Sequence, residues 1–489
     1  MLVDYEYRSG NLIISYVNKD GRIMLKYVPW SRPTKFITTG DDDPEKSGRY
    51  VTWNGQSVKE IYSRYPNKFS VYDFIDNLLE DERDEIYEYN EPDIYFVDIE
   101  NEILDKKPEP HLAESAIQSI SIVNKDKVLV IGTEPLSKEQ IDSIESDINI
   151  HFKKFETKYK FKYIQYKNEY DLLYNFFNKL VPRMPVMTGW NFINYDWVFL
   201  VARARKIGVD PDVSSFTKKM NQPFNFNSMG QQNYAEIPAH RVIVDYMELF
   251  KKWDTSVKVK ESQSLDFASE KILGLKKINY EGDLKRLHRE DYRKFVYYNA
   301  VDSCLVQRIH VKMKYVDILY GMAVLGKIKI KDAISTLALT EGILREKLRD
   351  QKNIVLVRDE REDSGGSSSI KGGWVKEPVR GMATWTCCYD FASLYPTTMR
   401  QFNISADSYK GQKVKNKDYS IFNGHQLQIE DSDIITLNNS VFKKEDGVVT
   451  QVMGEVYTDR KKWKKVMMQK HEELERMKEE LRNLEDTPL

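Results

Sequence analysis

The sequence predicts an α/β protein of several domains, and three patterns support this prediction. With 489 residues, the chain is long enough for roughly three or four domains of ordinary size. Residues 1 to about 70 contain short strand-like segments separated by turns, as expected for a mixed, β-rich N-terminal domain at residues 1–93. Residues 94–325 alternate strand-like and helix-like segments, which is typical of an α/β domain. Residues 457–485 contain no Gly or Pro and have the pattern of one long helix.

Changes in these patterns set the expected boundaries. Residues 70–85 have helical spacing, and the dense apolar run that follows from Ile94 predicts a buried strand that opens the second domain. Residues 326–358 are expected to form a helix and a strand that pack back on the N-terminal domain. The Ser- and Gly-rich loop 364–369 marks the next boundary region, and we place a third domain at residues 359–456.

Composition narrows the classes of partner. The chain has 74 basic and 75 acidic residues, so a nucleic-acid-binding protein would need its positive charge in local patches. The apolar runs are far shorter than the roughly 20 residues of a membrane span, so no membrane partner is expected. Three cysteines, two of them the neighbours Cys387 and Cys388, fit neither a disulfide framework nor an ordinary zinc site. We expect a reducing interior.

Carboxylates from three places in the α/β segment could gather at one site. Asp98 and Glu100 end a strand-like run, and side chains at i and i+2 point to the same face of a strand. Two carboxylates held together repel each other unless a cation lies between them, and oxygen-rich sites suit Mg²⁺ or Mn²⁺. Asp196 lies where a strand gives way to a helix, and Tyr298 and Asp302 share one helical face at i and i+4.

Each of these signals alone has a simpler explanation. A D-x-E pair is most often a solvated strand end, and an acid at the start of a helix is favoured by the helix dipole. A Tyr and an Asp one turn apart on a helix require no function. The combination, in this order along the chain, is far more specific.

The motifs D-I-E, G-W-N-x₄-D and Y-N-x₂-D together resemble the three exonuclease motifs of family B DNA polymerases. The resemblance implies that residues 94–325 form a 3′→5′ proofreading exonuclease domain with an RNase H-like fold. It implies that two Mg²⁺ or Mn²⁺ ions are held there by four carboxylates and that a tyrosine orients the attacking water. Carried over motif by motif, these residues are Asp98, Glu100, Asp196, Asp302 and Tyr298.

Residues 277–302 resemble the T-even bacteriophage branch of this family especially closely. By that similarity, Lys277 reaches the scissile phosphate as a point charge; a plain surface lysine is the alternative. The Asn- and Gln-rich stretch between Gln222 and Asp245 predicts a protruding hairpin. In the family such a hairpin helps to separate primer from template.

The strongest motif in the chain is D-F-A-S-L-Y-P at residues 390–396. The pattern predicts a buried strand that ends at Asp390, a tight turn, and a helix with Pro396 in its first turn. Backbone N–H groups of the turn would gather at the helix N-terminus, which suits phosphate oxygens; these nucleotide-binding candidates are Phe391, Ser393, Leu394 and Tyr395. An ordinary strand, turn and helix with a capping Asp is the alternative.

This motif resembles the polymerase motif D-x-x-S-L-Y-P of family B, which implies a partial palm domain. The resemblance makes Asp390 a catalytic metal ligand for a Mg²⁺-bound dNTP once the palm is complete. It places Tyr395 under the incoming sugar, where it excludes a 2′-hydroxyl. Upstream, Gly372 and Gly373 resemble a Y-x-G-G segment that contacts DNA, with Ile370 where the family has tyrosine.

A basic cluster opens the terminal segment, residues 457–489, which resembles the first fingers helix of the family. Arg460 and Lys464 lie at i and i+4, so they share one face and could grip a triphosphate. A solvated basic turn is the alternative. Further along, four apolar residues form a stripe with the spacing of a helix seam: Leu474, Met477, Leu481 and Leu484.

We therefore expect the N-terminal part of a family B DNA polymerase, with a 3′→5′ exonuclease and half of a polymerase site. The family's second fingers helix, its D-T-D segment and its thumb have no counterpart in the sequence. Polymerisation is thus expected to need a second polypeptide or a missing C-terminal half, as in a split gene or a truncated chain. The expected partners are a single-stranded 3′ end, a primer–template and that second chain, and the resemblance allows a sliding clamp. The expected location is the cytoplasm, that of an infected bacterium for a phage gene.

Two other functions stay open at this point. One is a free-standing 3′→5′ DNA exonuclease with a vestigial palm. The other is a non-catalytic regulatory protein that binds nucleic acid, RNA included, although residues 1–90 show no dense basic and aromatic cluster.

Overall fold

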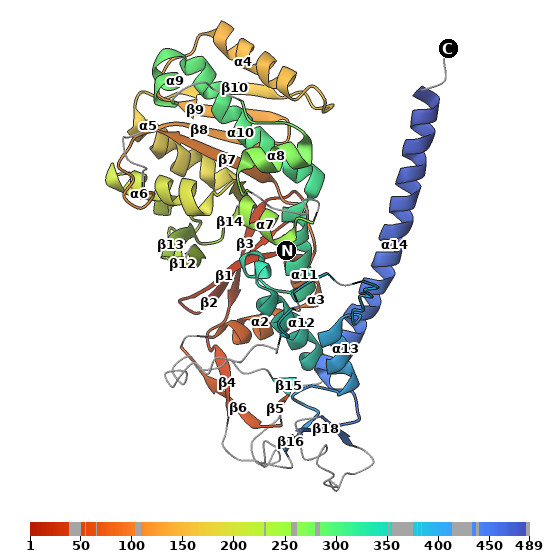
Figure 1. The fold of residues 1–489 in the computed structure, drawn as a ribbon. Helices are drawn as coiled ribbons and strands as arrows, with labels where there is room; N and C mark the ends of the chain where they lie inside the picture. Colours follow the sequence, from red (N-terminus) through yellow and green to blue (C-terminus); the bar gives the residue numbers. More distant parts are fainter. Residues whose placement is uncertain are drawn as a thin grey trace. The chain divides into compact units, whose positions relative to one another are not determined.

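The chain forms two compact units in the structure, which is a computed structural model (Figure 1). One unit contains Met1–Ser31 and Ile75–Gly342, and the other contains Arg32–Phe74 and Ile343–Leu489. The described residues are 1–38, 50–53, 55–64, 66–102, 109–228, 231–255, 262–278, 284–350, 353–354, 375–378, 380–382, 384–412, 433–436 and 440–485.

The first unit is built on a six-stranded mixed sheet with the order β10-β9-β8-β7-β11-β14. Its central strand β7 pairs antiparallel with β8 and parallel with β11. The expected alternation of strands and helices is present. The strands are β7 (Ile94–Asn101), β8 (Ile117–Asn124), β9 (Lys127–Gly132), β10 (Lys160–Gln165), β11 (Val186–Gly189) and β14 (Val242–Asp245).

The two faces of this sheet are covered differently because side chains alternate along β7. Val97 and Ile99 join an apolar core with residues of α5 (Glu169–Asn175) and α6 (Val198–Lys206). The opposite face, which carries Asp98 and Glu100, is covered by the long helix α10 (Tyr292–Met313), which packs against β7 and β8 (Figure 1).

Two smaller β elements belong to the same unit. β1 (Leu2–Arg8), β2 (Asn11–Val17) and β3 (Ile23–Pro29) form an antiparallel sheet. The hairpin expected between Gln222 and Asp245 is confirmed, because β12 (Met220–Ser228) pairs antiparallel with β13 (Gln231–Pro238). The other elements of this unit are α3 (Glu80–Tyr87), α4 (Lys138–His151), η1 (Phe176–Leu180), η2 (Val181–Arg183), η3 (Ile193–Trp197), η4 (Pro211–Ser214), α7 (Tyr246–Trp253), α8 (Leu265–Leu273), α9 (Leu284–Glu290), α11 (Tyr315–Gly326) and η5 (Ile330–Ile334).

The second unit contains two small sheets and the C-terminal helices. One sheet has the order β15-β5-β6-β4, and β15 pairs in parallel with β5; the other has the order β16-β18-β17. Its strands are β4 (Thr34–Thr38), β5 (Tyr50–Thr52), β6 (Ser57–Tyr62), β15 (Asn353–Ile354), β16 (Tyr409–Gln412), β17 (Asp433–Ile435) and β18 (Ser440–Lys443), and the helices at its borders and within it are α2 (Lys68–Asp76), α12 (Thr336–Asp350), α13 (Leu394–Gln401) and α14 (Val448–Glu485).

Two helix boundaries differ from the sequence-based expectation. The single helix expected at 70–85 is two helices, since α2 ends at Asp76 and α3 begins at Glu80. The terminal helix begins at Val448 rather than at Tyr457, although the β-branched residues at its start favour a strand locally. Its first N–H groups bond to residues outside the helix. The N–H of Val448 donates to Asp407 Oδ2 (3.0 Å), and that of Val449 donates to Ser405 Oγ (3.2 Å). These caps override the local preference.

Within the described part of the chain, no helix combines the length and the apolar character that crossing a bilayer requires.

Gly189 tests the close approach of β11 and β7. A Cβ at this position would collide with the carbonyl oxygen of Val97, so the two strands would have to move apart. We expect Gly189→Ala to lower the free energy of unfolding by about 1–3 kcal/mol, measured by urea denaturation. Gly321→Ala on α11 is the matched control, because its Cβ would meet nothing within 4 Å. The control should be neutral or stabilise by up to about 1 kcal/mol, and equal effects of the two changes would contradict the strand contact.

Candidate active site

Three carboxylates predicted from the sequence meet between β7 and α10. Asp98, Glu100 and Asp302 each offer one ligand oxygen, and these atoms all lie within 4.8 Å of one another. Asp98 and Glu100 lie on β7, and Asp302 lies on α10, which packs against that strand. The cluster therefore joins residues about 200 positions apart in the sequence. The i and i+2 spacing explains why Asp98 and Glu100 share a face, whereas the packing of α10 on β7 brings Asp302 to them.

The donor set of this cluster fits a divalent cation. All three groups are carboxylates, the hard oxygen ligands that Mg²⁺ and Mn²⁺ prefer. Asp302 is 4% exposed, and its Oδ1 atom is buried with no hydrogen-bond partner among the described residues. A buried acceptor without a donor is costly unless a cation or water satisfies it.

Burial raises the pKa values of all three acids, and repulsion within the cluster adds to this effect at Asp98 and Glu100. Burial, then the charge of Asp302, raises the pKa of Asp98 to about 7, against the opposing effects of Lys277 and Asn299. The pKa of Glu100 lies well above its ordinary value, first because of burial and then because of Asp98 and Asp302. Burial also raises the pKa of Asp302, although Lys277 opposes it. A bound cation would favour the ionised forms and offset this cost.

Lys277 lies at the cluster rather than on an open surface. Its Nζ atom is 2.5 Å from Asp302 Oδ2 and 5.5 Å from the centre of the Tyr298 ring. Its backbone N–H donates to Asp266 Oδ1 (2.8 Å), which fixes the segment that carries it. Burial alone would lower the pKa of Lys277, but Asp302 and Tyr298 raise it overall. The ammonium group therefore stays charged beside the carboxylates.

Tyr298 precedes Asp302 by one helical turn, so its ring and the carboxylate share the face of α10 that meets the cluster. Burial, followed by the charge of Asp302, raises the pKa of its phenol. The hydroxyl thus remains protonated at neutral pH, and it can both donate and accept a hydrogen bond.

Asp196 is next to the three-carboxylate group but is not part of it in the structure. It lies on the short helix η3 and is 5% exposed. Its Oδ1 atom accepts the backbone N–H of Ile99 (3.2 Å), the residue between Asp98 and Glu100. Burial, followed by the charge of Asp98, raises its pKa well above the ordinary value. The fourth predicted carboxylate is thus tied to the backbone of β7.

Two residues at the site received no role from the sequence. Asn299 is fully buried on α10, and its Nδ2 donates to Asp98 Oδ2 (2.8 Å). Asp245 ends β14 and accepts the N–H of Ile193 (3.1 Å) on η3 as well as the N–H of Met247 (3.0 Å). Burial raises the pKa of Asp245 to about 7. The sequence offered a weak signal for both, since Asn299 stands inside the Y-N-x₂-D motif and Asp245 precedes a helix as a cap would.

The D-F-A-S-L-Y-P motif lies in the second unit and differs in part from the expectation. No strand precedes Asp390: residues 384–390 are exposed, and no strand pairs with them among the described residues. Without a neighbouring strand, their N–H and C=O groups have no ladder to join, so the expected buried strand is wrong here. The helix is confirmed as α13, with Pro396 in its first turn and Ser393 before it in the left-handed region (φ 53°).

The structure joins this motif to the basic start of the terminal segment. Arg460 on α14 donates from Nη1 to Ser393 Oγ (3.1 Å), a residue 67 positions earlier. Lys464 lies one turn further along α14 and is exposed. Phe391 and Tyr395 are also largely exposed, at 77% and 78%. Leu394 is the first residue of α13, and the predicted DNA-binding Gly372 and Gly373 lie outside the described residues.

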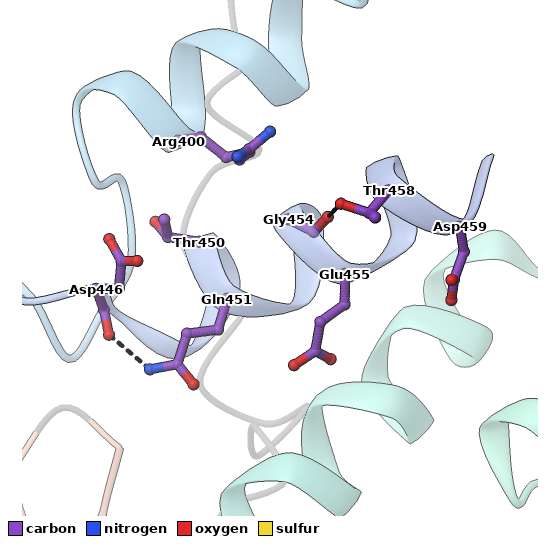
Figure 2. Close-up of a pocket in the computed structure, with 8 residues that line it drawn as sticks. All are labelled: Arg400, Asp446, Thr450, Gln451, Gly454, Glu455, Thr458 and Asp459. Atoms are coloured by element: carbon purple, nitrogen blue, oxygen red, sulfur yellow. Dashed lines mark hydrogen bonds between the residues drawn. The ribbon is translucent and has the colours of Figure 1, made fainter. Parts of the chain in front are cut away.

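A polar groove of about 660 Å³ in this unit is lined by Arg400 of α13, by Asp446 and by residues of the first part of α14 (Figure 2). Its lining includes the guanidinium group of Arg400 and the carboxylates of Asp446, Glu455 and Asp459. Glu455 pairs with Lys347 (2.8 Å). No residue predicted from the sequence to bind nucleotide or metal lines this groove.

Comparisons with known proteins agree with both parts of the chain. Residues 56–267 match the exonuclease domain of DNA polymerase family B, and residues 336–484 match DNA polymerase family B. A DNA-directed DNA polymerase of Escherichia phage RB69 is 26% identical over 413 residues, which are 81% of this chain and 45% of that polymerase. That of Enterobacteria phage T4 is 24% identical over 310 residues, 62% of this chain and 34% of the relative. The chain thus spans less than half the length of these relatives.

The raised pKa of Asp98 predicts how the metal-free protein responds to pH. In the unfolded chain this carboxyl titrates near pH 4, so between about pH 4 and pH 7 the folded state binds more protons at this group. The free energy of unfolding should therefore fall as pH rises through this window. In EDTA, Asp98→Asn should melt at a higher temperature than the parent at pH 8 and at a similar temperature at pH 4. The melting temperatures of both proteins across this range check the sign, and a gap that narrows towards pH 8 would contradict it.

Proposed function

Because the chain belongs to the family B DNA polymerases, we propose that its first function is metal-dependent 3′→5′ proofreading of DNA. The observation that carries this proposal is the meeting of Asp98, Glu100 and Asp302 within 4.8 Å, with Asp196 bonded to the strand between the first two. Exonuclease domains of this family use divalent metals, and the cluster could hold one. We assign the activity to an RNase H-like domain at residues 94–325.

Each residue at the site has a distinct proposed role. Two bound Mg²⁺ or Mn²⁺ ions would supply acidity to a water molecule and stabilise the leaving oxygen of the scissile phosphate. Asp98, Glu100, Asp196 and Asp302 would hold these ions. The protonated hydroxyl of Tyr298 would orient the attacking water by a hydrogen bond.

We propose two roles for Lys277, one in the metal-free protein and one when DNA is bound. In the structure its ammonium group neutralises Asp302 at 2.5 Å. With cations held by the carboxylates, the Lys277 ammonium group would be free to contact a phosphate oxygen of the DNA as a point charge.

The second proposed function belongs to the D-F-A-S-L-Y-P motif. At the start of α13, Arg460 donates a hydrogen bond to Ser393 (3.1 Å). This contact supports a site for the triphosphate of a dNTP, and the residues that we propose to bind it are Phe391, Ser393, Leu394, Tyr395, Arg460 and Lys464. We propose Asp390 as a metal ligand of this polymerase site. Two-ion catalysis uses carboxylates from more than one segment, so we propose that nucleotide addition needs the further polymerase segments that the relatives contain, in the same or a second polypeptide.

The proposed domain layout follows the sequence-based boundaries. It comprises an N-terminal domain at 1–93 with 326–358, the exonuclease domain, a partial palm at 359–456 and a fingers helix at 457–489. Leu474, Met477 and Leu481 on α14 are 49–61% exposed, which supports a partner segment that covers this stripe. The proposed partners are single-stranded 3′ ends, primer–template DNA and a sliding clamp, and the phage relatives support the cytoplasm of an infected bacterium as the location.

Removing two of the three clustered acids tests the exonuclease proposal. Asp98→Ala combined with Glu100→Ala should reduce digestion of a 3′-labelled single-stranded oligonucleotide by more than about 1,000-fold, because the cations lose their shared ligands. The metal-free variant should be at least as stable as the parent, since two partly buried acids that repel each other are removed. Digestion of the oligonucleotide at the parental rate would rule out this site, and a parent without any Mg²⁺-dependent digestion would favour the non-catalytic binding protein.

Tyr298→Phe separates water orientation from metal binding. The change removes one hydroxyl and no metal ligand, so the digestion rate should fall by about 100-fold and stay measurable. Asp302→Ala is the comparison, and its digestion rate should fall to that of the Asp98→Ala, Glu100→Ala double variant. Single-turnover digestion at saturating Mg²⁺ measures both, and an equal loss in the two variants would show that the roles are misassigned.

A further inference from the structure

The carboxylate cluster is backed by a layer of neutral polar side chains that the sequence motifs did not explain. On β8, Ser121 pairs with Asp98 and Ser119 pairs with Glu100. Residues directly opposite in an antiparallel pair lie on the same face of the sheet. Both serines therefore lie on the face covered by α10, and both are fully buried.

Asn299 connects this layer to the cluster. Its side chain is fully buried on α10. Its Oδ1 accepts the hydroxyl of Ser119 (3.1 Å), and its Nδ2 donates to Asp98 Oδ2 (2.8 Å). Its backbone carbonyl accepts the hydroxyl of Ser121 (3.0 Å). The two side-chain bonds engage both ends of the amide, so the Ser119 bond fixes which end faces Asp98.

A neutral amide is chemically suited to this position. In the part of the chain that the structure describes, Asn299 is the one side chain that donates a hydrogen bond to Asp98. Unlike a lysine, the amide adds no positive charge that would oppose a cation; unlike a second carboxylate, it adds no repulsion. It also engages one carboxylate oxygen only, which leaves Oδ1 of Asp98 for a metal.

We propose that Asn299 is a positioning residue of the metal centre, which holds the Asp98 carboxylate in the orientation that binds a divalent cation. This inference rests on the proposed exonuclease function. Outer partners of ligating carboxylates typically contribute 10- to 100-fold to metal affinity. The residue acts through Asp98 and does not itself contact metal or DNA.

Binding of Mn²⁺ alone tests the proposal without DNA. Asn299→Leu keeps the approximate size of the side chain and removes its amide, so the full chain should bind Mn²⁺ about 10- to 100-fold more weakly. Electron paramagnetic resonance of unbound Mn²⁺ measures this affinity. Gln307→Leu is the matched control, because it removes a buried amide from the same helix that bonds Tyr159 and the Lys125 carbonyl instead of the cluster. The control should bind Mn²⁺ like the parent, and parental affinity in a folded Asn299→Leu would overturn the proposal.

A double-mutant cycle distinguishes positioning from a purely structural role. In an Asp98→Ala background, Asn299→Leu should cause no further loss of Mn²⁺ affinity, because the carboxylate that the amide holds is gone. An equal loss in both backgrounds would overturn the proposal. In single-turnover digestion, raising Mn²⁺ should restore the rate of Asn299→Leu towards that of the parent, since weaker metal binding is overcome by concentration.

Ser119→Ala decides the matter if Asn299→Leu does not fold. This change removes only the bond that fixes the amide, so Mn²⁺ affinity should fall in the same direction by a few-fold, and unchanged affinity would overturn the proposal. The Asp98→Ala single variant separates the two levels of the argument. If it binds Mn²⁺ as tightly as the parent, the metal centre itself is wrong; if binding depends on Asp98 but not on Asn299, only the positioning role fails.

Discussion

Repulsion among the carboxylates gathered between β7 and α10 is the constraint on which the arrangement of the first unit depends. Asp98, Glu100 and Asp302 meet within 4.8 Å, and burial raises the pKa of each of them. Such a cluster persists only where nearby groups offset the cost. Lys277 provides a charge at 2.5 Å from Asp302, and Asn299 provides a neutral donor at 2.8 Å from Asp98. These contacts partly offset the free-energy cost of bringing the acids together and leave carboxylate oxygens that can bind a cation.

Fold and site share the same strand, so neither can change independently. The alternation of β7 sends Val97 and Ile99 into the core under α5 and α6 while their neighbours form the cluster. The backbone N–H of Ile99 also anchors Asp196. A shift of β7 by one residue would therefore place the acids in the apolar core and the apolar side chains at the site. This coupling explains why packing around the strand has to be close.

In the second unit, one part of the candidate nucleotide site is held by defined contacts, whereas the carboxylate part is exposed. The phosphate side consists of a helix start and the contact between Arg460 and Ser393, which need only α13 and α14. The carboxylate side consists of Asp390, which is exposed because no strand pairs with the segment before it among the described residues. A helix satisfies its own backbone, whereas a strand depends on neighbours.

The sequence alone determined the features that depend on local periodicity and short motifs. These include the mixed α/β character, the shared face of Asp98 and Glu100, the hairpin between Gln222 and Asp245 and the helix with Pro396 in its first turn. The motifs and their resemblance also predicted that the carboxylates of one site come from distant segments, but not the individual contacts that hold them. That Lys277 lies against Asp302, that Asn299 holds Asp98 and that Asp196 bonds to the backbone of β7 depend on how α10 and η3 pack on the sheet. The caps that start α14 at Val448 instead of Tyr457 also come from residues about 40 positions earlier. Local patterns fix the direction of a side chain on its own element, but only tertiary packing brings the partners from other elements within bonding distance.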